Sequence, residues 1–237
     1  MILILLMKFD TPLIKTKFIK RYKRFFVDVL LNKEILTAHC PNSGSMMGLL
    51  NEGKNAWISE PKNTERKLKY TLEILDQNKQ KVGVNTHLTN RIVEEALINK
   101  KIKELENFDQ VQREVKFNSN TRFDFLVSNK KEQAFVEVKN VTLKRENDCA
   151  EFPDAPTTRG QKHLLELISA KEKEYQAYLI FLIQREDCNF FKISKDIDKK
   201  YYENFIQAKK KGVKFLCYSS KVTDKEIILK NKIEIKF

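Results

Sequence analysis

Residues 121–143 read TRFDFLVSNKKEQAFVEVKNVTL, which is two β-rich runs on either side of the polar turn 128–133. When the strands fold back about this turn, Asp124 lies opposite Glu137, and cross-strand partners share a face with Cβ atoms roughly 5 Å apart. Lys139 lies two residues beyond Glu137 and therefore joins the same face. The neighbouring positions are apolar, so three charged side chains are stable here only if they pair with one another or hold a metal ion.

Such a hairpin suits the metal-dependent cleavage of phosphodiester bonds. Asp124 and Glu137 would hold Mg²⁺ or Mn²⁺, and the carbonyl of Val138 would complete the protein ligands, because Mg²⁺ takes few of them and keeps several waters. The metal ion lowers the pKa of a bound water. Lys139 would orient that water or stabilise the developing charge. Glu95, on the helix predicted before the hairpin, would add an acid as an outer ligand or at a second metal ion.

A second helix is predicted to begin at Thr158, and its first turn is rich in polar and basic side chains. These would contact the scissile phosphate or a neighbouring one. They are Arg159, Gln161, Lys162 and His163. The alternative for the hairpin is a surface salt-bridge cluster, because the E-x-K pattern occurs by chance in many Lys-rich strands. The aspartate in the paired strand, the preceding helix glutamate and the following basic helix together favour the metal site.

The first part of the chain has short β-like runs and few helical periods. These runs are 18–30, 34–39, 55–59 and 68–75. Around five strands in about 75 residues fit a small barrel of the oligonucleotide-binding (OB) type. Its start mixes cations with aromatic side chains, a combination that binds single strands by neutralising the backbone and stacking on bases. The alternative is that an aromatic residue, Phe25 or Phe26, fills the barrel core while the lysines are merely solvated.

From Leu88 the pattern changes to α-β-β-β-α-β-α-β, which predicts an α/β layer with a mixed sheet. We therefore predict two domains, an OB-like domain over 1–82 and an α/β domain over 83–237. The boundary lies near Val82–Gly83, where no flexible linker marks it.

The first helix of the α/β domain is predicted over residues 88–102. Asn85 and Asn90 lie at its N-terminus, where exposed N–H groups attract anions. Residues 144–157, after the hairpin, are predicted as a loop.

The net charge of the chain and its cysteines indicate the class of binding partner and the cellular compartment. Lysine and arginine total 45 against 32 acidic residues, a formal charge of +13 that suggests a polyanionic partner. Lysine enrichment from an AT-rich genome is the alternative. The four cysteines have no paired spacing, which argues against a zinc site or disulfide framework and for a reducing cytoplasm. The apolar start, residues 1–7, is too short to span a membrane and reads as an N-terminal strand or an extension.

At these residues the chain resembles the sugar fermentation stimulation protein A (SfsA) family. The resemblance implies an N-terminal OB-like domain and a C-terminal domain of the PD-(D/E)xK nuclease fold. It also implies DNA binding without marked sequence preference and a role in regulating sugar (maltose) metabolism genes. The matching stretches are RYKRF (21–25), HCPNSGSM (39–46), VNT and Asn90 (84–90), EA (95–96), RFDF (122–125), VEVKNVTL (136–143) and FPDAPTTRGQKHL (152–164).

Carried over residue by residue, Asp124, Glu137 and Lys139 match the nuclease core, Glu95 the helix acid and Gln161 the later helix position. Two mild departures are Ser43, where the family usually has Thr, and Phe123, where it usually has Ile. We expect the nucleic-acid contacts at Arg21, Tyr22, Lys23, Arg24, His39, Asn42, Asn85, Asn90, Arg122, Arg159, Lys162 and His163.

Two functions follow from these features. The first is a cytoplasmic DNA-binding protein, for single- or double-stranded DNA, that keeps a nuclease-like metal site and regulates sugar metabolism. The second is an active Mg²⁺-dependent nuclease that hydrolyses DNA or RNA. No membrane partner is expected, and a homodimer is left open.

Overall fold

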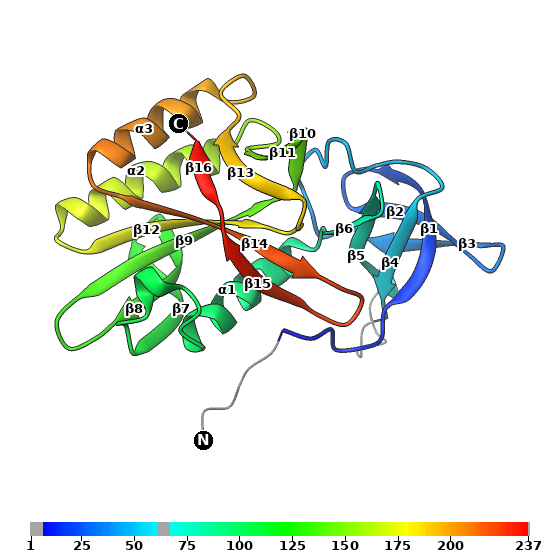
Figure 1. The fold of residues 1–237 in the computed structure, drawn as a ribbon, viewed down its shortest axis with the longest axis horizontal. Helices are drawn as coiled ribbons and strands as arrows, with labels where there is room; N and C mark the ends of the chain where they lie inside the picture. Colours follow the sequence, from blue (N-terminus) through cyan, green and yellow to red (C-terminus); the bar gives the residue numbers. More distant parts are fainter. Residues whose placement is uncertain (1–6, 61–66, 237) are drawn as a thin grey trace.

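The computed structural model describes residues 7–60 and 67–236, which form an all-β barrel followed by a larger α/β part (Figure 1). Of the N-terminal strand or extension expected at residues 1–7, only Met7 lies within the described residues. No helix within those described ranges is both long and apolar enough to cross a membrane.

The N-terminal part is a closed barrel. Its sheet has the order β3-β2-β1-β4-β5-β6, and a parallel pairing between β3 and β5 closes it. Alternate residues of a strand point inward, and Phe18, Val27, Val29, Ile58 and Leu72 belong to the barrel core. The predicted OB-like barrel is therefore confirmed. Its strands are β1 (Ile14–Tyr22), β2 (Phe26–Leu31), β3 (Glu34–His39), β4 (Asn55–Ser59), β5 (Tyr70–Gln77) and β6 (Gln80–Gly83).

One strand predicted in the barrel is wrong. The run 18–30 forms two antiparallel strands, β1 and β2, with Lys23, Arg24 and Phe25 as the turn between them. Lys23 and Arg24 adopt positive φ angles of 46° and 61°. This conformation costs a non-glycine residue roughly 1–2 kcal/mol, so hairpin turns of this kind normally carry Gly or Asn as a signal. Phe25 is 46% exposed and does not fill the core, whereas Phe26 is half-buried.

The α/β part is built on a six-stranded sheet with the order β15-β14-β12-β9-β8-β7. β9, β12 and β14 run parallel and the other three strands are antiparallel to their neighbours, so the sheet is mixed, as predicted. Its strands are β7 (Gln110–Asn118), β8 (Thr121–Ser128), β9 (Gln133–Val141), β12 (Gln176–Ile183), β14 (Lys214–Val222) and β15 (Ile227–Lys232).

In the described part of the chain, three helices cover this sheet. α1 packs on one face, and α2 and α3 lie together on the other, so each face has its own apolar core (Figure 1). The assignment to the PD-(D/E)xK type stays a prediction. The helices are α1 (Thr89–Ile98), α2 (Thr158–Glu172) and α3 (Lys199–Lys210).

Two further predictions for this part are wrong. The loop predicted over 144–157 contains most of β10 (Leu143–Glu146) and all of β11 (Asp148–Phe152). They join β13 (Cys188–Ile193) and β16 (Glu234–Lys236) in a second sheet, with the order β10-β11-β13-β16. β10 was not predicted because its charged residues resemble those of a solvent-exposed loop. In the structure Arg145 pairs with Glu151 of β11, and Glu146 pairs with Lys192 of β13.

The helix predicted over 88–102 also ends early. Ile98 is the last residue of α1, Asn99 is its C-cap, and Lys100 adopts a positive φ of 53°. A left-handed residue just after the cap is a common way for a helix to end, and here it is supplied by lysine where glycine is usual. The predicted domain boundary, Val82–Gly83, falls at the end of β6.

The barrel contacts the α/β part through the loop 40–46. The Asp154 carboxylate accepts a hydrogen bond from the Met46 N–H at 3.0 Å, and its backbone carbonyl accepts one from Ser45 Oγ at 2.7 Å. Gly44 lies so close that a Cβ added there would be 2.5 Å from Asp154 Oδ2. The turn therefore needs glycine for its close approach to a carboxylate.

We expect Gly44→Ala to lower the free energy of unfolding by about 1–3 kcal/mol, because the added methyl group overpacks the junction against Asp154. The same change made in an Asp154→Ala background should cost clearly less, since the clashing carboxylate is gone. Urea denaturation of the two single variants and the double variant measures this coupling. Strictly additive effects would show that the clash does not limit the junction.

Candidate functional site

The hairpin of β8 and β9 has the predicted register. Phe125 pairs with Val136, and the register continues to Ser128 and Gln133. At the turn, Asn129 Oδ1 accepts hydrogen bonds from the N–H groups two and three residues later, at 2.8 and 3.0 Å. One further step of this register from Phe125 brings Asp124 to the level of Glu137.

Asp124 is the carboxylate that burial makes hard to ionise. Its Oδ1 accepts a hydrogen bond from Asn90 Nδ2 and its Oδ2 accepts one from the Val138 N–H, both at 2.7 Å. Burial, with the charge of Glu137 in addition, raises the pKa of Asp124 to about 6, although these two hydrogen bonds and Lys139 oppose the rise. The Asp124 carboxyl therefore changes its charge close to neutral pH.

Glu137 is buried more deeply, with 3% of its surface exposed, yet it is ionised. Burial alone would raise its pKa, but the charge of Lys139 and the contact with His163 outweigh burial, and the pKa of Glu137 is lowered. Lys139 Nζ donates to Glu137 Oε1 at 2.6 Å, and His163 Nδ1 contacts the same oxygen. Lys139 Nζ also lies 3.2 Å from His163 Nδ1.

The second carboxylate oxygen of Glu137, Oε2, differs from the first in its hydrogen bonding. Glu137 Oε2 is buried and has no hydrogen-bond partner among the described residues. Tyr201, at the start of α3, is fully buried, and its hydroxyl likewise has no partner within the described part of the chain. Burial, together with the charge of Glu137, raises the pKa of Tyr201 well above its ordinary value. A buried carboxylate oxygen without a partner is a vacant ligand position for a cation or a water.

The sequence did not single out Tyr201. It lies on the buried side of α3, where a tyrosine is usually an ordinary core residue. Gly160 in α2 makes its position possible, because an added Cβ there would be 3.1 Å from Tyr201 Cε2. A glycine inside a helix pattern was the available signal for this close packing.

Two predicted catalytic residues have other partners. Glu95 is 2% exposed and accepts hydrogen bonds from the Met7 N–H at 2.5 Å and from Lys101 Nζ at 3.0 Å. Gln161 Nε2 donates to the Asp198 carboxylate, at 2.9 and 3.0 Å from its two oxygens. The structure therefore does not bring Glu95 or Gln161 onto the carboxylates of the hairpin.

The helix contact to the hairpin comes from Asn90 instead. Asn90 and Glu95 are five residues apart in α1, so they lie on different sides of the helix. His163, predicted as a phosphate contact, lies within the cluster on Glu137.

Several predicted nucleic-acid contacts hold the protein itself together. The Arg21 guanidinium donates to four backbone carbonyls, including Asn42 O at 2.6 Å and Gly44 O at 2.9 Å. The Asn42 side chain bonds the backbone of Val84 and Gly44. Asn85 donates to Glu73 at 2.8 Å and caps the turn before α1.

Other predicted contacts lie on the surface. Lys23, Arg24, Arg122 and Arg159 are exposed, and Tyr22 is 36% exposed with its hydroxyl on Asp28. Lys162 is exposed and donates to the Asn120 carbonyl at 2.9 Å. His39 is half-buried among aromatic rings.

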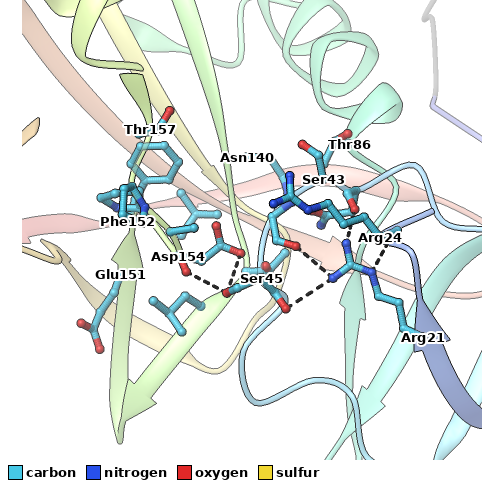
Figure 2. A pocket seen from close by; sticks show the side chains of 18 residues that line it. Arg21, Arg24, Ser43, Ser45, Thr86, Asn140, Glu151, Phe152, Asp154 and Thr157 are labelled. Carbon is cyan, nitrogen blue, oxygen red and sulfur yellow. Dashed lines mark hydrogen bonds between the residues drawn. The ribbon is translucent and has the colours of Figure 1, made fainter. Parts of the chain in front are cut away.

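A cleft of about 630 Å³ separates the barrel from the α/β part (Figure 2). Arg24 extends into it from the barrel side, and Asn140, the residue after Lys139, lines it from β9. Within the described residues the Arg24 guanidinium has neither a hydrogen bond nor an ion pair, so the cleft contains an unneutralised cation. Asp124, Glu137 and Lys139 do not line this cleft. Its other polar lining residues include Ser43, Thr86 and Thr157.

The donors are carboxylate oxygens, which fit a hard divalent cation such as Mg²⁺ or Mn²⁺ better than a soft metal ion. Among residues 7–60 and 67–236 there is no group of three or more His, Cys, Asp and Glu side chains arranged around one point. Mg²⁺ needs no such cage, because it binds through one or two carboxylates and keeps several waters. Asp124 and the vacant Glu137 Oε2 supply such a pair.

The pKa of Asp124 predicts a pH dependence of stability. Because the folded pKa, about 6, lies above the ordinary value of 3.8, the protonated carboxyl stabilises the fold at low pH. That stability is lost as the pH rises through 6. Relative to Asp124→Asn, which imitates the protonated form, the wild type should lose about 2–3 kcal/mol between about pH 4 and pH 8, since a tenfold change in proton affinity is worth about 1.4 kcal/mol. Urea denaturation in EDTA measures the difference.

The exposed Asp109 provides the control, because water already solvates its carboxylate. Asp109→Asn should leave the pH profile of stability almost unchanged. Equal profiles for the two variants would show that Asp124 carries no burial penalty.

Comparison with known proteins identifies the family. The SfsA N-terminal OB domain family matches residues 19–84, and the sugar fermentation stimulation protein RE domain family matches residues 87–226. A sugar fermentation stimulation protein homolog of Pelagibacter ubique is 57% identical over 97% of this chain and 99% of its own length. The homolog of Pseudoalteromonas atlantica is 43% identical over 96% of this chain and 98% of its own length.

A solved structure is similar over almost the whole chain. It is that of Pyrococcus furiosus SfsA in complex with Ca²⁺, with a TM-score of 0.88 and 26% identity. The similarity covers 98% of this chain and 99% of the other. Both halves of the chain and its full length thus match one group of proteins, and the chain belongs to the sugar fermentation stimulation protein (SfsA) family.

Proposed function

We propose that this protein binds DNA with little sequence preference and holds Mg²⁺ or Mn²⁺ at Asp124 and Glu137. The observation that carries the metal site is the buried, unpartnered Glu137 Oε2, beside a second carboxylate that burial keeps from ionising easily. A cation there would satisfy the oxygen and favour ionised Asp124. The site would then be of the PD-(D/E)xK type.

DNA binding is supported by charge and shape. The net charge of +13 gives a field that attracts phosphates. Lys23 and Arg24 project from the barrel, Arg159 is exposed at the start of α2, and the cleft contains the unneutralised Arg24. Phosphate contacts of this kind position nucleic acid without reading its sequence.

The metal proposal has support from a relative. The Pyrococcus furiosus protein was solved in complex with Ca²⁺, an ion that takes oxygen ligands as Mg²⁺ does. In this chain the carboxylates of Asp124 and Glu137 and the carbonyl of Val138 would hold the ion. When bound, the ion would lower the pKa of a bound water and neutralise phosphate charge.

The surrounding residues would prepare this site. Asn90 and the Val138 N–H fix the two oxygens of Asp124, which sets the direction of the carboxylate. Lys139 holds one oxygen of Glu137 and leaves the other open. Lys139 would also place a positive charge beside a bound phosphate.

The family name adds a link to sugar metabolism, and a role in regulating sugar (maltose) metabolism genes belongs to this proposal. The four cysteines are free and buried, which fits a reducing cytoplasm. The homodimer stays a prediction.

DNA affinity should fall steeply as salt rises, because each neutralised phosphate releases counterions. We expect Arg24→Gln to reduce the magnitude of the log–log slope by about 0.7–0.9, the share of one phosphate contact. Fluorescence anisotropy at several salt concentrations measures it. The matched control is Lys33→Gln, an exposed cation with a positive φ at the neighbouring hairpin turn. A wild-type slope near zero would remove the electrostatic basis of the proposal.

The second candidate is an active nuclease, favoured by the 2.6 Å contact that keeps Lys139 beside Glu137. With Mn²⁺ and a panel of single-stranded, double-stranded and flapped DNA and RNA, Glu137→Gln and Lys139→Met should each lose at least about 100-fold in cleavage rate. Calorimetry should separate their roles, because only Glu137→Gln removes a ligand and weakens Mg²⁺ binding.

Lys200→Met, at a 64% exposed side chain on α3, is the control for this screen. It should cleave as the wild type does. If the Glu137 and Lys139 variants also cleave at the wild-type rate, the cleavage comes from a contaminant and the protein only binds.

A further inference from the structure

Three aromatic rings form a row across the junction of the barrel and the α/β part. The Phe25 and His39 ring centroids are 6.4 Å apart with planes 20° apart, and those of His39 and His87 are 6.5 Å apart with planes 41° apart. Phe25 lies in the turn between β1 and β2, His39 ends β3, and His87 lies in the 3-10 turn before α1. Residues distant in sequence thus bring their rings together, with Phe25 and His39 stacked and His39 and His87 tilted.

The outer members of this ring row are open to solvent. Phe25 is 46% exposed and His87 is exposed. The Phe25 side chain is not part of the barrel core, which contains Phe18, Val27 and Val29. The exposed part of the Phe25 ring is an apolar surface suited to a flat partner.

Cations stand directly beside the ring row. Lys23 and Arg24 precede Phe25 in the same turn, and both are exposed. Their backbones adopt the left-handed conformation that non-glycine residues avoid, at φ 46° and 61°. One short turn therefore offers two positive charges and one aromatic face, which matches the phosphate and base of a nucleotide.

The far end of the row leads to the proposed metal site. His87 lies three residues before Asn90, which holds Asp124. His39 and His87 also line a cavity of about 260 Å³, together with Arg91, which pairs with Asp10 at 3.7 Å, and with Glu60 and Glu73. A chain lying along the row would pass from the turn of the barrel to the start of α1.

We propose that the ring row Phe25–His39–His87 is a stacking platform for unpaired bases, so that the preferred substrate is single-stranded nucleic acid or a single-stranded segment of a larger one. Bases inside a duplex are covered on both faces by their neighbours and cannot reach these rings. Charge complementarity at Lys23 and Arg24 selects nucleic acid over an apolar peptide. This inference rests on the proposed nucleic-acid binding.

The test compares three labelled probes: an oligothymidylate, an abasic strand with the same number of phosphates, and a hairpin duplex. The wild type should bind the oligothymidylate more tightly than the abasic strand. Phe25→Ala should weaken oligothymidylate binding about 5- to 100-fold, the effect of losing one stacked base, and leave abasic binding unchanged. Fluorescence anisotropy at fixed salt gives the dissociation constants.

Ile35→Ala is the matched control, because Ile35 is a 66% exposed apolar residue of the same barrel outside the ring row. It should bind all three probes as the wild type does. His87→Ala, at a second exposed ring, should reproduce the Phe25→Ala pattern, and thermal unfolding checks that each variant is folded.

The possible outcomes are distinct. Equal affinities for the oligothymidylate and the abasic strand, or equal effects of Phe25→Ala and Ile35→Ala, would overturn the stacking platform while nucleic-acid binding stands. A wild type that binds the duplex more tightly than the oligothymidylate would also overturn the stacking platform and leave nucleic-acid binding standing. If the wild type binds none of the probes, the platform and the proposed function fail together.

Discussion

The structure around the hairpin depends on keeping the Glu137 carboxylate ionised in a buried position. A buried charge is unstable unless it is paired, so Lys139 and His163 must both reach it. His163 lies on α2, so this contact adds a polar link between α2 and the sheet beside the apolar core that packs them together. Asp124, one strand away, has the opposite behaviour, since its pKa is raised. Two neighbouring carboxylates whose pKa values are pushed apart are typical of sites that handle both protons and cations.

The hairpin could be predicted from sequence because its information is local. The period of two residues in each strand and the polar turn fix which side chains face one another. The position of Asp124 opposite Glu137 follows directly from these two features. The helix acid could not be predicted in the same way. Choosing between Asn90 and Glu95 needs the rotation of α1 against the sheet, which depends on packing. The contact of Gln161 with Asp198 also needed the structure, because the two residues are distant in sequence.

The barrel shows the same limit at a turn. The turn at Lys23 and Arg24 contains no glycine or asparagine, so the sequence does not mark it as a turn. The alternation of inward and outward side chains restarts after it, in β2. Whether Phe25 points into the barrel or away from it depends on that restart. The sequence therefore predicted the barrel, its basic character and its aromatic content, while the identity of the exposed ring needed the structure. Arg21 is the converse case, a cation in a basic run that the fold uses for its own backbone.

The close approach of Gly44 to Asp154 has a consequence for how a polymer could enter the cleft. A hinge between the barrel and the α/β part would have to separate a backbone from a carboxylate that are already in contact. The contacts of the 40–46 loop with Asp154 therefore oppose a hinge movement that would widen the cleft at this edge. Gly44, Ser45 and Asp154 all line the cleft, so a polymer that enters it would lie against this junction.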